Sequence, residues 1–354
     1  MTANLDTADM ATCRALLKGG SRTFHAASKV LPRHVADPAI ALYAFCRLAD
    51  DDVDLGTDRA AAVARLRARL DRAYRGLPMD CAADRMFADV VKQFCIPRAL
   101  PEALLEGLAW DADTRRYETL QDLTNYAARV AGAVGAMMTL VMGQRSPEIV
   151  ARACDLGVAM QLTNIARDIG EDARAGRLYL PLSWLRDAGI DPDIWITNPV
   201  FTPEIADIAQ RLLDAADTLY ARATWGIFHL PISCRPGIYA ARALYAEIGR
   251  ELERSALDSI SRRTVVSGRR KLAVLARTLL LREPEWAPAR RSVLHDAQLE
   301  ATRFLIDAVA ATPMHEAATR TSPIRPVEDR IVWVIDLFAR LERRDQLQRN
   351  ASFR

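Results

Sequence analysis

Apolar residues recur three and four positions apart along most of the 354-residue chain. Near its end, Ile331, Ile335 and Phe338 follow this spacing, which gathers side chains on one face of an α-helix. Runs that alternate apolar and polar residues, as strands do, are almost absent. Alanine, leucine and arginine dominate the composition and favour helices. The pattern therefore predicts an all-α protein.

Glycine and proline divide this pattern into helices of ordinary length with short connections. The breaks are predicted at Gly19-Gly20 and at Pro32, Pro38, Pro78, Pro97, Pro101, Pro147, Pro181, Pro192, Pro199 and Pro231. The glycine-rich strand-to-helix turn of dinucleotide-binding domains does not occur, since the string GAVG at residues 132–135 lies inside a helical run.

The helical pattern weakens between Pro284 and Pro326, a stretch with five prolines. A last helix is predicted at residues 329–348. We therefore divide the chain into one helical domain, residues 1–283, and a C-terminal helical extension, residues 284–354, packed on it. Trp333 and Phe338 in the last helix favour a core or dimer contact over a membrane-surface element.

Charge and cysteine content exclude several classes of protein. Charged residues make up 26 % of the chain but the net charge is only +3, so no nucleic-acid partner is expected. The six cysteines form no CxxC pair, which indicates a reducing, cytoplasmic setting. The N-terminal string MTANLDTADM lacks signal-peptide features, and the apolar stretch at residues 130–143 is too short to span a bilayer. Peripheral membrane contact and the oligomeric state are left open.

Four carboxylates occupy five positions in the string RLADDDVD, residues 47–54, which continues the apolar ALYAFC. Asp50 and Asp54 are four residues apart, so both lie on one face of a helix, with Asp51 close to that face. Like charges at this spacing destabilise an isolated helix by a few tenths of a kcal/mol per pair. Taken alone, such a run usually marks a solvated face.

A second polar ladder follows in QLTNIARDIGEDARAGRLYLP, residues 161–181. Asn164, Asp168 and Asp172 are also four residues apart and stack about 6 Å from one another along a helix. Gln161 and Asn164 interrupt a run in which a plain core helix would carry apolar side chains. Two ladders with matched spacing, each flanked by apolar residues, favour a binding site over two solvated faces.

A magnesium ion would explain why acidic residues gather in this way. Mg²⁺ takes one or two carboxylates and completes its octahedron with water and substrate phosphates, so two facing ladders would cradle a diphosphate. Arg47, Arg167 and Arg177 add fork-shaped donors suited to phosphate oxygens. We therefore expect a diphosphate site held by Mg²⁺, for which Mn²⁺ could substitute.

Five strings of the sequence resemble segments of the squalene/phytoene synthase family. YAFCRLADDDVD and QLTNIARDIGEDARAGRLYLP are similar to its two signature segments. GSRTFHAASKVLP, RRYETLQDLTNYAARVAGAVGAMM and SRRTVVSGRRKL are similar to further segments, in the right order. The resemblance covers roughly residues 12–280 and is closest to the bacterial phytoene-forming members. One departure is Asp52, where the family often has an apolar or small residue.

The resemblance implies a single-domain isoprenoid-synthase helical bundle with a central cavity. That family joins two prenyl diphosphates head to head through a cyclopropyl diphosphate. For this chain it implies two geranylgeranyl diphosphates as substrates, phytoene as the product that opens carotenoid biosynthesis, and no use of NADPH. Two alternatives stay open: a squalene or dehydrosqualene synthase that uses C15 farnesyl diphosphate, and a related assembly factor without catalysis. A non-catalytic relative would be expected to lose carboxylates that are all present here.

The resemblance also implies roles for individual residues. The metal and diphosphate positions are Asp50, Asp54, Asn164, Asp168 and Asp172, whose four aspartates form the implied catalytic set together with Tyr126. Tyr126 is implied to manage a proton or to stabilise a passing cation through its ring. Further substrate-binding positions are Arg47, Arg167 and Arg262 for phosphate, and Tyr43, Gln161 and Tyr179 along the cavity.

The string GSRTFHAASKVLP is expected to begin a helix after Gly20, with Ser21 as its N-cap and as part of the substrate-binding wall. Phe24 and Ser28 would lie one turn apart on the face toward the cavity. Trp110 and Asp111, in contrast, are expected to be a packing and helix-cap feature. Gly132 and Gly135 are expected to let helices pack closely around the cavity.

Overall fold

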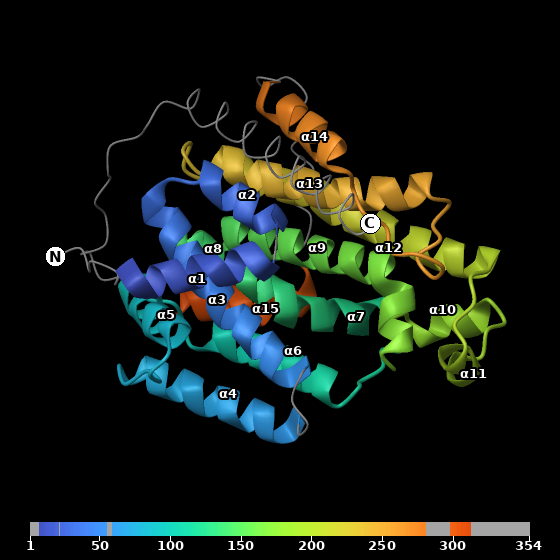
Figure 1. Ribbon diagram of the computed structural model, residues 1–354, viewed down its shortest axis with the longest axis horizontal. Helices are drawn as coiled ribbons and strands as arrows, with labels where there is room; N and C mark the ends of the chain where they lie inside the picture. Colours follow the sequence, from blue (N-terminus) through green and yellow to red (C-terminus); the bar gives the residue numbers. More distant parts are fainter. Residues whose placement is uncertain (1–6, 21, 55–58, 281–297, 313–354) are drawn as a thin grey trace, which may run out of the picture.

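The computed structural model describes residues 7–20, 22–54, 59–280 and 298–312. Within these ranges the chain forms helices and no strand, which confirms the all-α prediction. The helices surround α9 (Pro147–Arg174), which crosses the middle of the molecule (Figure 1).

Helices before α9 and helices after it both pack around this central helix. The first set is α1 (Thr7–Gly20), α2 (Arg22–Val30), α3 (Arg33–Asp54), α4 (Arg59–Tyr74), α5 (Ala82–Gln93), α6 (Ala99–Ala112), α7 (Leu120–Ala127) and α8 (Ala133–Val141), with a π-helical turn at Ala128–Gly132. The second set is α10 (Leu182–Asp187), α11 (Pro192–Thr197), α12 (Pro203–Phe228), α13 (Arg235–Arg254), α14 (Gly268–Leu280) and α15 (Arg303–Ala310), the last preceded by a 3₁₀ turn at Glu300–Thr302. Proline in the first turn of α9, α12 and α13 removes no helical hydrogen bond.

Pro38 does not end a helix, so the break predicted there is wrong. It lies inside α3, where a proline removes one backbone hydrogen bond. The apolar face of α3 nevertheless continues beyond it, with Ala41, Leu42 and Phe45 buried in the main core. Packing of this face outweighs the missing bond.

Glycine lets α8 and α9 approach one another closely. A Cβ atom on Gly135 would lie 2.3 Å from the carbonyl oxygen of Ala153, and one on Gly157 would lie 2.3 Å from that of Ala131. Any larger residue would force these backbones apart. The packing role predicted for Gly135 is confirmed, whereas Gly132 has room for a Cβ, with its nearest neighbours at 3.7 Å.

The described part of the C-terminal extension contacts the helical domain. Helix α15 packs against α6, α8 and α9, and its Leu305 is fully buried in the main core. The helix predicted at residues 329–348 lies outside the described residues, as do Ser21 and the side chain of Asp54. Among the helices that the structure describes, none is long and apolar enough to cross a membrane.

Candidate active site

Two cavities meet in the middle of the bundle. One is apolar, has a volume of about 330 Å³ and lies between α3, α8, α9, α12 and α13. The other is polar, has a volume of about 720 Å³ and lies between α3, α6, α9 and the segment 255–267. Phe24, Tyr43, Gln161, Asn164 and Tyr245 line both. The bundle therefore has the central cavity that was predicted, with a polar end and an apolar end.

Members of both predicted ladders line the polar cavity. Asp50 reaches it from α3, whereas Asp168 and Asp172 reach it from α9, with Asn164 deeper along the same helix. The cations that share the cavity wall are Arg47, Arg167, Arg177, Arg263 and Lys271. The cavity thus combines hard oxygen donors with cationic side chains, which is the chemistry needed to hold a metal-bound diphosphate.

Arginine side chains hold the carboxylates in place. Asp168 accepts hydrogen bonds from Arg167 (Nε to Oδ1, 2.8 Å) and from Arg263 (Nε to Oδ1, 2.9 Å; Nη2 to Oδ2, 3.2 Å). Arg47 forms an ion pair with Asp50, with Nη1 and Oδ2 3.4 Å apart. Because these guanidinium groups lie on the cavity wall, they are placed to exchange carboxylate oxygens for the oxygens of a diphosphate.

Negative charge is poorly compensated at Asp172 and Asp111. Burial, followed by the charge of Asp168, raises the pKa of Asp172 to about 7, although Arg177 opposes the shift. Burial likewise raises the pKa of Asp111 to about 6, against hydrogen bonds from two tyrosines. A divalent cation would compensate the buried negative charge of both carboxylates.

The donor set fits a magnesium ion that is shared with the substrate. Among the described residues, no three histidine, cysteine, aspartate or glutamate side chains converge as ligands of one ion. Mg²⁺ commonly uses one or two carboxylates and completes its shell with water and phosphate. Asp50 on α3 and Asp168 and Asp172 on α9 offer carboxylates from two sides of the cavity.

Asp111 lines the polar cavity, so its assignment as a packing and cap feature is wrong. It lies in the last turn of α6. Tyr126 donates its hydroxyl to Oδ2 of Asp111 (2.8 Å), and Tyr179 donates to Oδ1 (2.7 Å). Burial raises the pKa of both phenols far above the ordinary value, which keeps them protonated. Sequence spacing could not reveal this group, because its members come from three separate segments.

Three tyrosine rings form a wall beside this carboxylate. The ring centroids of Tyr117 and Tyr126, and those of Tyr126 and Tyr179, are each 5.2 Å apart. Trp110 lies behind them, 6.5 Å from Tyr117, so its predicted packing role is confirmed. Tyr126 is followed closely by the π-helical turn, a feature found frequently at functional sites. The ring faces offer the negative potential that a carbocation needs.

Arg263, and not the predicted Arg262, contacts the polar cavity. The polar cavity is lined by Arg263, Thr264, Val265 and Val266, while Arg262 is exposed and does not line it. The segment 255–267 is not helical, so no periodicity indicates which of two consecutive arginines faces inward. The assignment of Arg262 as a cavity residue is therefore corrected by one position.

The segment 255–267 lies directly on α9 between the two carboxylates of the second ladder. The N–H of Gly170 donates to the carbonyl oxygen of Ser259 (3.2 Å), and Arg174 donates to that of Ile260 (3.1 Å). A Cβ atom on Gly170 would lie 2.7 Å from the Ser259 oxygen. A glycine at this position therefore lets the segment approach α9 and bring Arg263 to Asp168.

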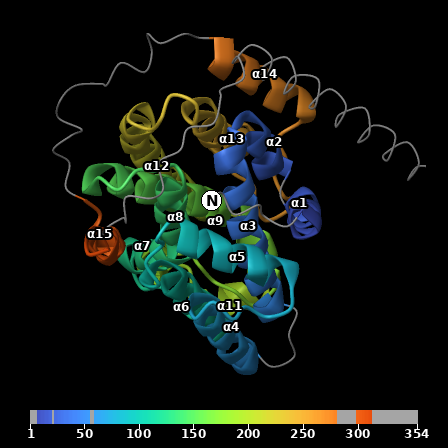
Figure 2. The same cartoon turned by 90° about the vertical axis from the view of Figure 1, so that its left-hand side faces the viewer.

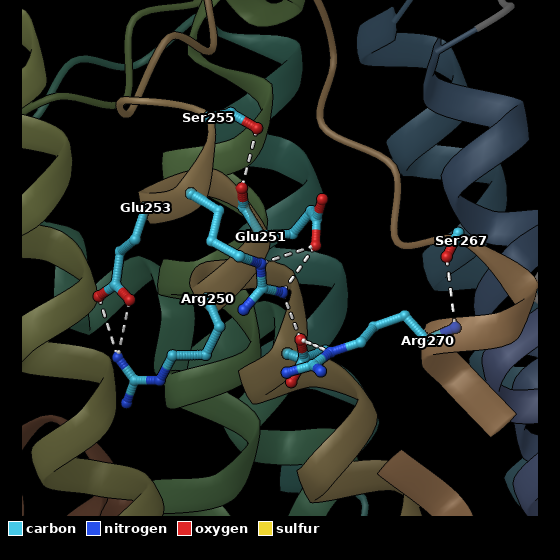
Figure 3. A network of polar contacts seen from close by, with 8 residues as sticks. Arg250, Glu251, Glu253, Ser255, Ser267 and Arg270 are labelled. Atoms are coloured by element: carbon cyan, nitrogen blue, oxygen red, sulfur yellow. Dashed lines mark hydrogen bonds and ion pairs between the residues drawn. The ribbon is translucent and has the colours of Figure 1, made fainter. Parts of the chain in front are cut away.

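A network of ion pairs anchors both ends of this segment (Figure 3). The Arg270 Nε atom donates to Glu247 (2.7 Å), and Arg254 donates to the same carboxylate and to Glu251 (Nε to Oε2, 3.1 Å). Burial alone would raise the pKa of Glu247, but the hydrogen bonds from Arg270 and Arg254 hold it below the ordinary value. The network ties the end of α13 to the start of α14.

We expect Gly170→Ala to lower kcat/KM for the prenyl diphosphate by about 10²-fold, because displacement of catalytic groups by about 1 Å can have an effect of this size. The added methyl group would push the segment 255–267, and Arg263 with it, away from α9. Steady-state kinetics measures the change. Gly132→Ala, whose Cβ has room, is the matched control. Equal activity of the two variants would show that this close approach is not needed.

Asp52, the acid that departs from the family pattern, contacts a different part of the molecule. Its carboxylate accepts a hydrogen bond from Arg69 of α4 (Nη1 to Oδ2, 2.9 Å). The same guanidinium group binds the fully buried Asp84 of α5 (Nη2 to Oδ1, 2.7 Å). Asp52 thus helps to hold α3, α4 and α5 together and does not line either cavity.

Phe24 and Ser28 both line the apolar cavity, which confirms the predicted face of α2. The ring of Phe24 lies 5.4 Å from that of Tyr245 and 6.1 Å from that of Tyr43. Ser28 donates its hydroxyl to the carbonyl oxygen of His25 (2.9 Å), so it presents only a small side chain to the cavity. The wall is therefore bulky near the polar cavity and open one turn further on.

The chain belongs to the squalene/phytoene synthase family, since residues 17–270 match the family description Squalene/phytoene synthase. It is 50 % identical over 311 residues to the phytoene synthase of Rhodobacter capsulatus, covering 87 % of this chain and 92 % of the relative. It is 45 % identical over 350 residues to the phytoene synthase of Cereibacter sphaeroides, covering 96 % and 95 %.

The solved structures that the chain resembles have the same fold. A dehydrosqualene synthase crystallised with a ligand aligns with a TM-score of 0.70 at 29 % identity, over 77 % of this chain and 95 % of that one. The squalene synthase HpnC from Alicyclobacillus acidocaldarius aligns with a TM-score of 0.65 at 25 % identity, over 70 % and 94 %. The isoprenoid-synthase bundle predicted from the sequence is confirmed.

Proposed function

We propose that this protein joins two molecules of geranylgeranyl diphosphate head to head to form phytoene. It is an enzyme of the prenyltransferase type, and its relatives at 45 % to 50 % identity are phytoene synthases. The observation that carries the proposal is the junction of an apolar cavity with a polar cavity lined by Asp50, Asp168 and Asp172. One end suits a long hydrocarbon tail and the other suits a diphosphate group.

Asp50, Asp168, Asp172 and Asn164 would hold Mg²⁺, together with Asp54 at the end of α3. When bound, the ion supplies Lewis-acid stabilisation of the departing diphosphate. The guanidinium groups of Arg47, Arg167 and Arg263 bind the diphosphate oxygens, with the ammonium group of Lys271 beside them. Because these cations stand on the cavity wall, they keep the charged group at the polar end while the tail enters the apolar cavity.

Aromatic and acidic residues of the polar cavity wall manage the carbocation that remains after the diphosphate departs. The aromatic faces of Tyr126 and Tyr179 stabilise positive charge, and the apolar walls exclude the water that would quench it. The double bond of the second substrate captures the cation, and the resulting tertiary cation loses a proton to the released diphosphate as it closes to a cyclopropyl diphosphate. After the second ionisation and rearrangement, Asp111 and the phenols hydrogen-bonded to it can receive the proton that is lost.

Incubation of the purified protein with Mg²⁺ and geranylgeranyl diphosphate, without NADPH, tests the proposal. Mass spectrometry is expected to find a C40 hydrocarbon, because the last step is loss of a proton and not a reduction. Farnesyl diphosphate serves as the comparison substrate. Accumulation of a cyclopropyl diphosphate until NADPH is added would contradict phytoene synthesis and favour squalene synthesis.

We expect Ser28→Phe to shift the preference from the C20 toward the C15 substrate, because a ring on this turn of α2 would fill the apolar cavity beyond Phe24. One isoprene unit contributes about 3–4 kcal/mol when fully buried. The measurement is kcat/KM for both substrates in wild type and variant, so that the C15 substrate is the internal control. An unchanged C20/C15 ratio, or a wild type that prefers C15, would show that this face of α2 does not set chain length.

A further inference from the structure

The turn between α12 and α13, residues 229–234, forms part of the wall of the apolar cavity. Ile227 and Leu230 line the cavity and are each only 4 % exposed. Phe228 and Ile232, which alternate with them along the chain, are 42 % and 76 % exposed. A single layer of chain therefore separates the cavity from two apolar side chains at the surface.

This turn lies at the end of the cavity that is remote from the carboxylates. The cavity-lining residues of α9 extend from Asn164 back to Arg152 and Ile149. Gly226 of α12 packs on Arg152, since a Cβ there would lie 2.4 Å from the Arg152 Cβ. Sixteen residues of α9 separate Arg152 from Asp168, which corresponds to about 24 Å at 1.5 Å per residue. Figure 2 views the molecule from this end, with the turn running between α12 and α13.

The surface around the turn favours a partner with negative charge. The sequence from Thr218 to Ala246 contains no aspartate or glutamate. The guanidinium carbon of Arg235 lies 5.0 Å from the ring centroid of Phe228, which joins a cation to an exposed aromatic ring. The ring of His229 packs on Trp225, with centroids 4.0 Å apart. Aromatic, aliphatic and basic side chains together are typical of segments that enter a membrane interface.

Helix α2 adds one exposed cation to the elements packed against α13. It contacts α13, and Lys29 at its end is exposed. Arg14 of α1, in contrast, forms an ion pair with Asp37 (Nη2 to Oδ1, 2.6 Å), so its charge is compensated.

We propose that the turn 229–234, through Phe228, Ile232 and Arg235, docks on an anionic lipid bilayer and passes the hydrocarbon product into it. A C40 hydrocarbon without a charged group has no favourable path into water. Docking at this end places the apolar end of the cavity against lipid while the polar cavity stays open to charged substrates. The transfer part of the inference rests on the proposed function, whereas the docking part does not.

Co-sedimentation of the full chain with vesicles tests the docking without any substrate. The wild type is expected to bind phosphatidylcholine vesicles that contain phosphatidylglycerol, and to bind pure phosphatidylcholine more weakly. The double variant Phe228→Ser, Ile232→Ser is expected to bind the anionic vesicles roughly tenfold more weakly. The matched control is Ile194→Ser, Val200→Ser, which removes two apolar side chains of similar exposure, 71 % and 50 %, at and beyond α11. Its binding is expected to stay within about twofold of the wild type.

Equal loss of vesicle binding in both double variants, or no binding by the wild type, would overturn the proposal. Light scattering without vesicles tests whether the turn instead contacts a second copy of this chain. If the wild type self-associates and the Phe228→Ser, Ile232→Ser variant does not, the membrane proposal is overturned. For the transfer step, anionic vesicles are expected to raise the turnover of the wild type but not that of the Phe228→Ser, Ile232→Ser variant. In detergent the two proteins are expected to turn over equally fast. If no hydrocarbon is formed in detergent, the proposed function is contradicted. The vesicle-binding experiment then still tests the docking by itself.

Discussion

Asp172→Asn is expected to reduce turnover by about 10³-fold, while making the metal-free protein harder to unfold at pH 8. The first effect follows because loss of a metal ligand removes several kcal/mol of transition-state stabilisation. The second follows because the pKa of Asp172 is raised to about 7 by burial and by Asp168. Between its ordinary value near 4 and pH 7, the folded protein holds more protons at this position than the unfolded chain does. Stability is therefore lost as pH rises through this range, and asparagine avoids the loss.

Thermal unfolding at pH 5 and pH 8, together with steady-state kinetics, measures both effects. Asp168→Asn is the matched comparison, since Arg167 and Arg263 already compensate the Asp168 charge. It is expected to lose turnover equally but to gain no stability at pH 8. Asp50→Ala and Asp54→Ala are also expected to abolish turnover. Near wild-type activity in any two of these four variants would refute the two-ladder site.

Asp111→Asn is expected to lower kcat by about 10²-fold with little change in KM, because proton transfer by a positioned group typically contributes 10²- to 10⁴-fold. The carboxylate accepts a hydrogen bond from each of two phenols. An asparagine side chain has only one acceptor oxygen, so its amide group would face the second donor. Tyr126→Phe and Tyr179→Phe separate the contributions of the two phenols.

Tyr117→Phe is the control for these variants, since its ring belongs to the same wall. The Tyr117 hydroxyl is buried and, within the described part of the chain, has no hydrogen-bond partner. Its removal is expected to leave kcat nearly unchanged. A large loss in Tyr117→Phe would show that removing any hydroxyl from this wall impairs the enzyme, and a fully active Asp111→Asn would show that the carboxylate is not needed.

Helical periodicity made most of the site predictable. A four-residue spacing fixes which side chains share a face, so Asp50, Asp168 and Asp172 could be assigned to ladders before any fold was known. The ladders were predicted to face one another because a shared cation would offset the repulsion between acids on apolar helices. The family resemblance placed Phe24 toward the cavity, and the spacing rule then placed Ser28 on the same face of α2.

Contacts between distant segments were not predictable in this way. Asp111 looked like the end of an ordinary helix, because its partners Tyr126 and Tyr179 come from other segments. The choice between Arg262 and Arg263 depended on a stretch without periodic structure. The sequence marked Asp52 only as a departure from the family pattern and gave no hint of its contact with Arg69. In each case the deciding contact joins segments that are far apart in the sequence.

Calorimetric titration of Mg²⁺, with and without a non-hydrolysable prenyl diphosphate analogue, tests the central claim most directly. The claim is that the two ladders hold the ion together with a diphosphate, because Mg²⁺ commonly takes only one or two carboxylates and completes its shell with water and phosphate. We expect weak Mg²⁺ binding alone and much tighter binding once the analogue is present, with the increase lost in Asp172→Asn. Tight binding of Mg²⁺ without the analogue would contradict the claim. So would binding of the analogue with an affinity that does not depend on Mg²⁺.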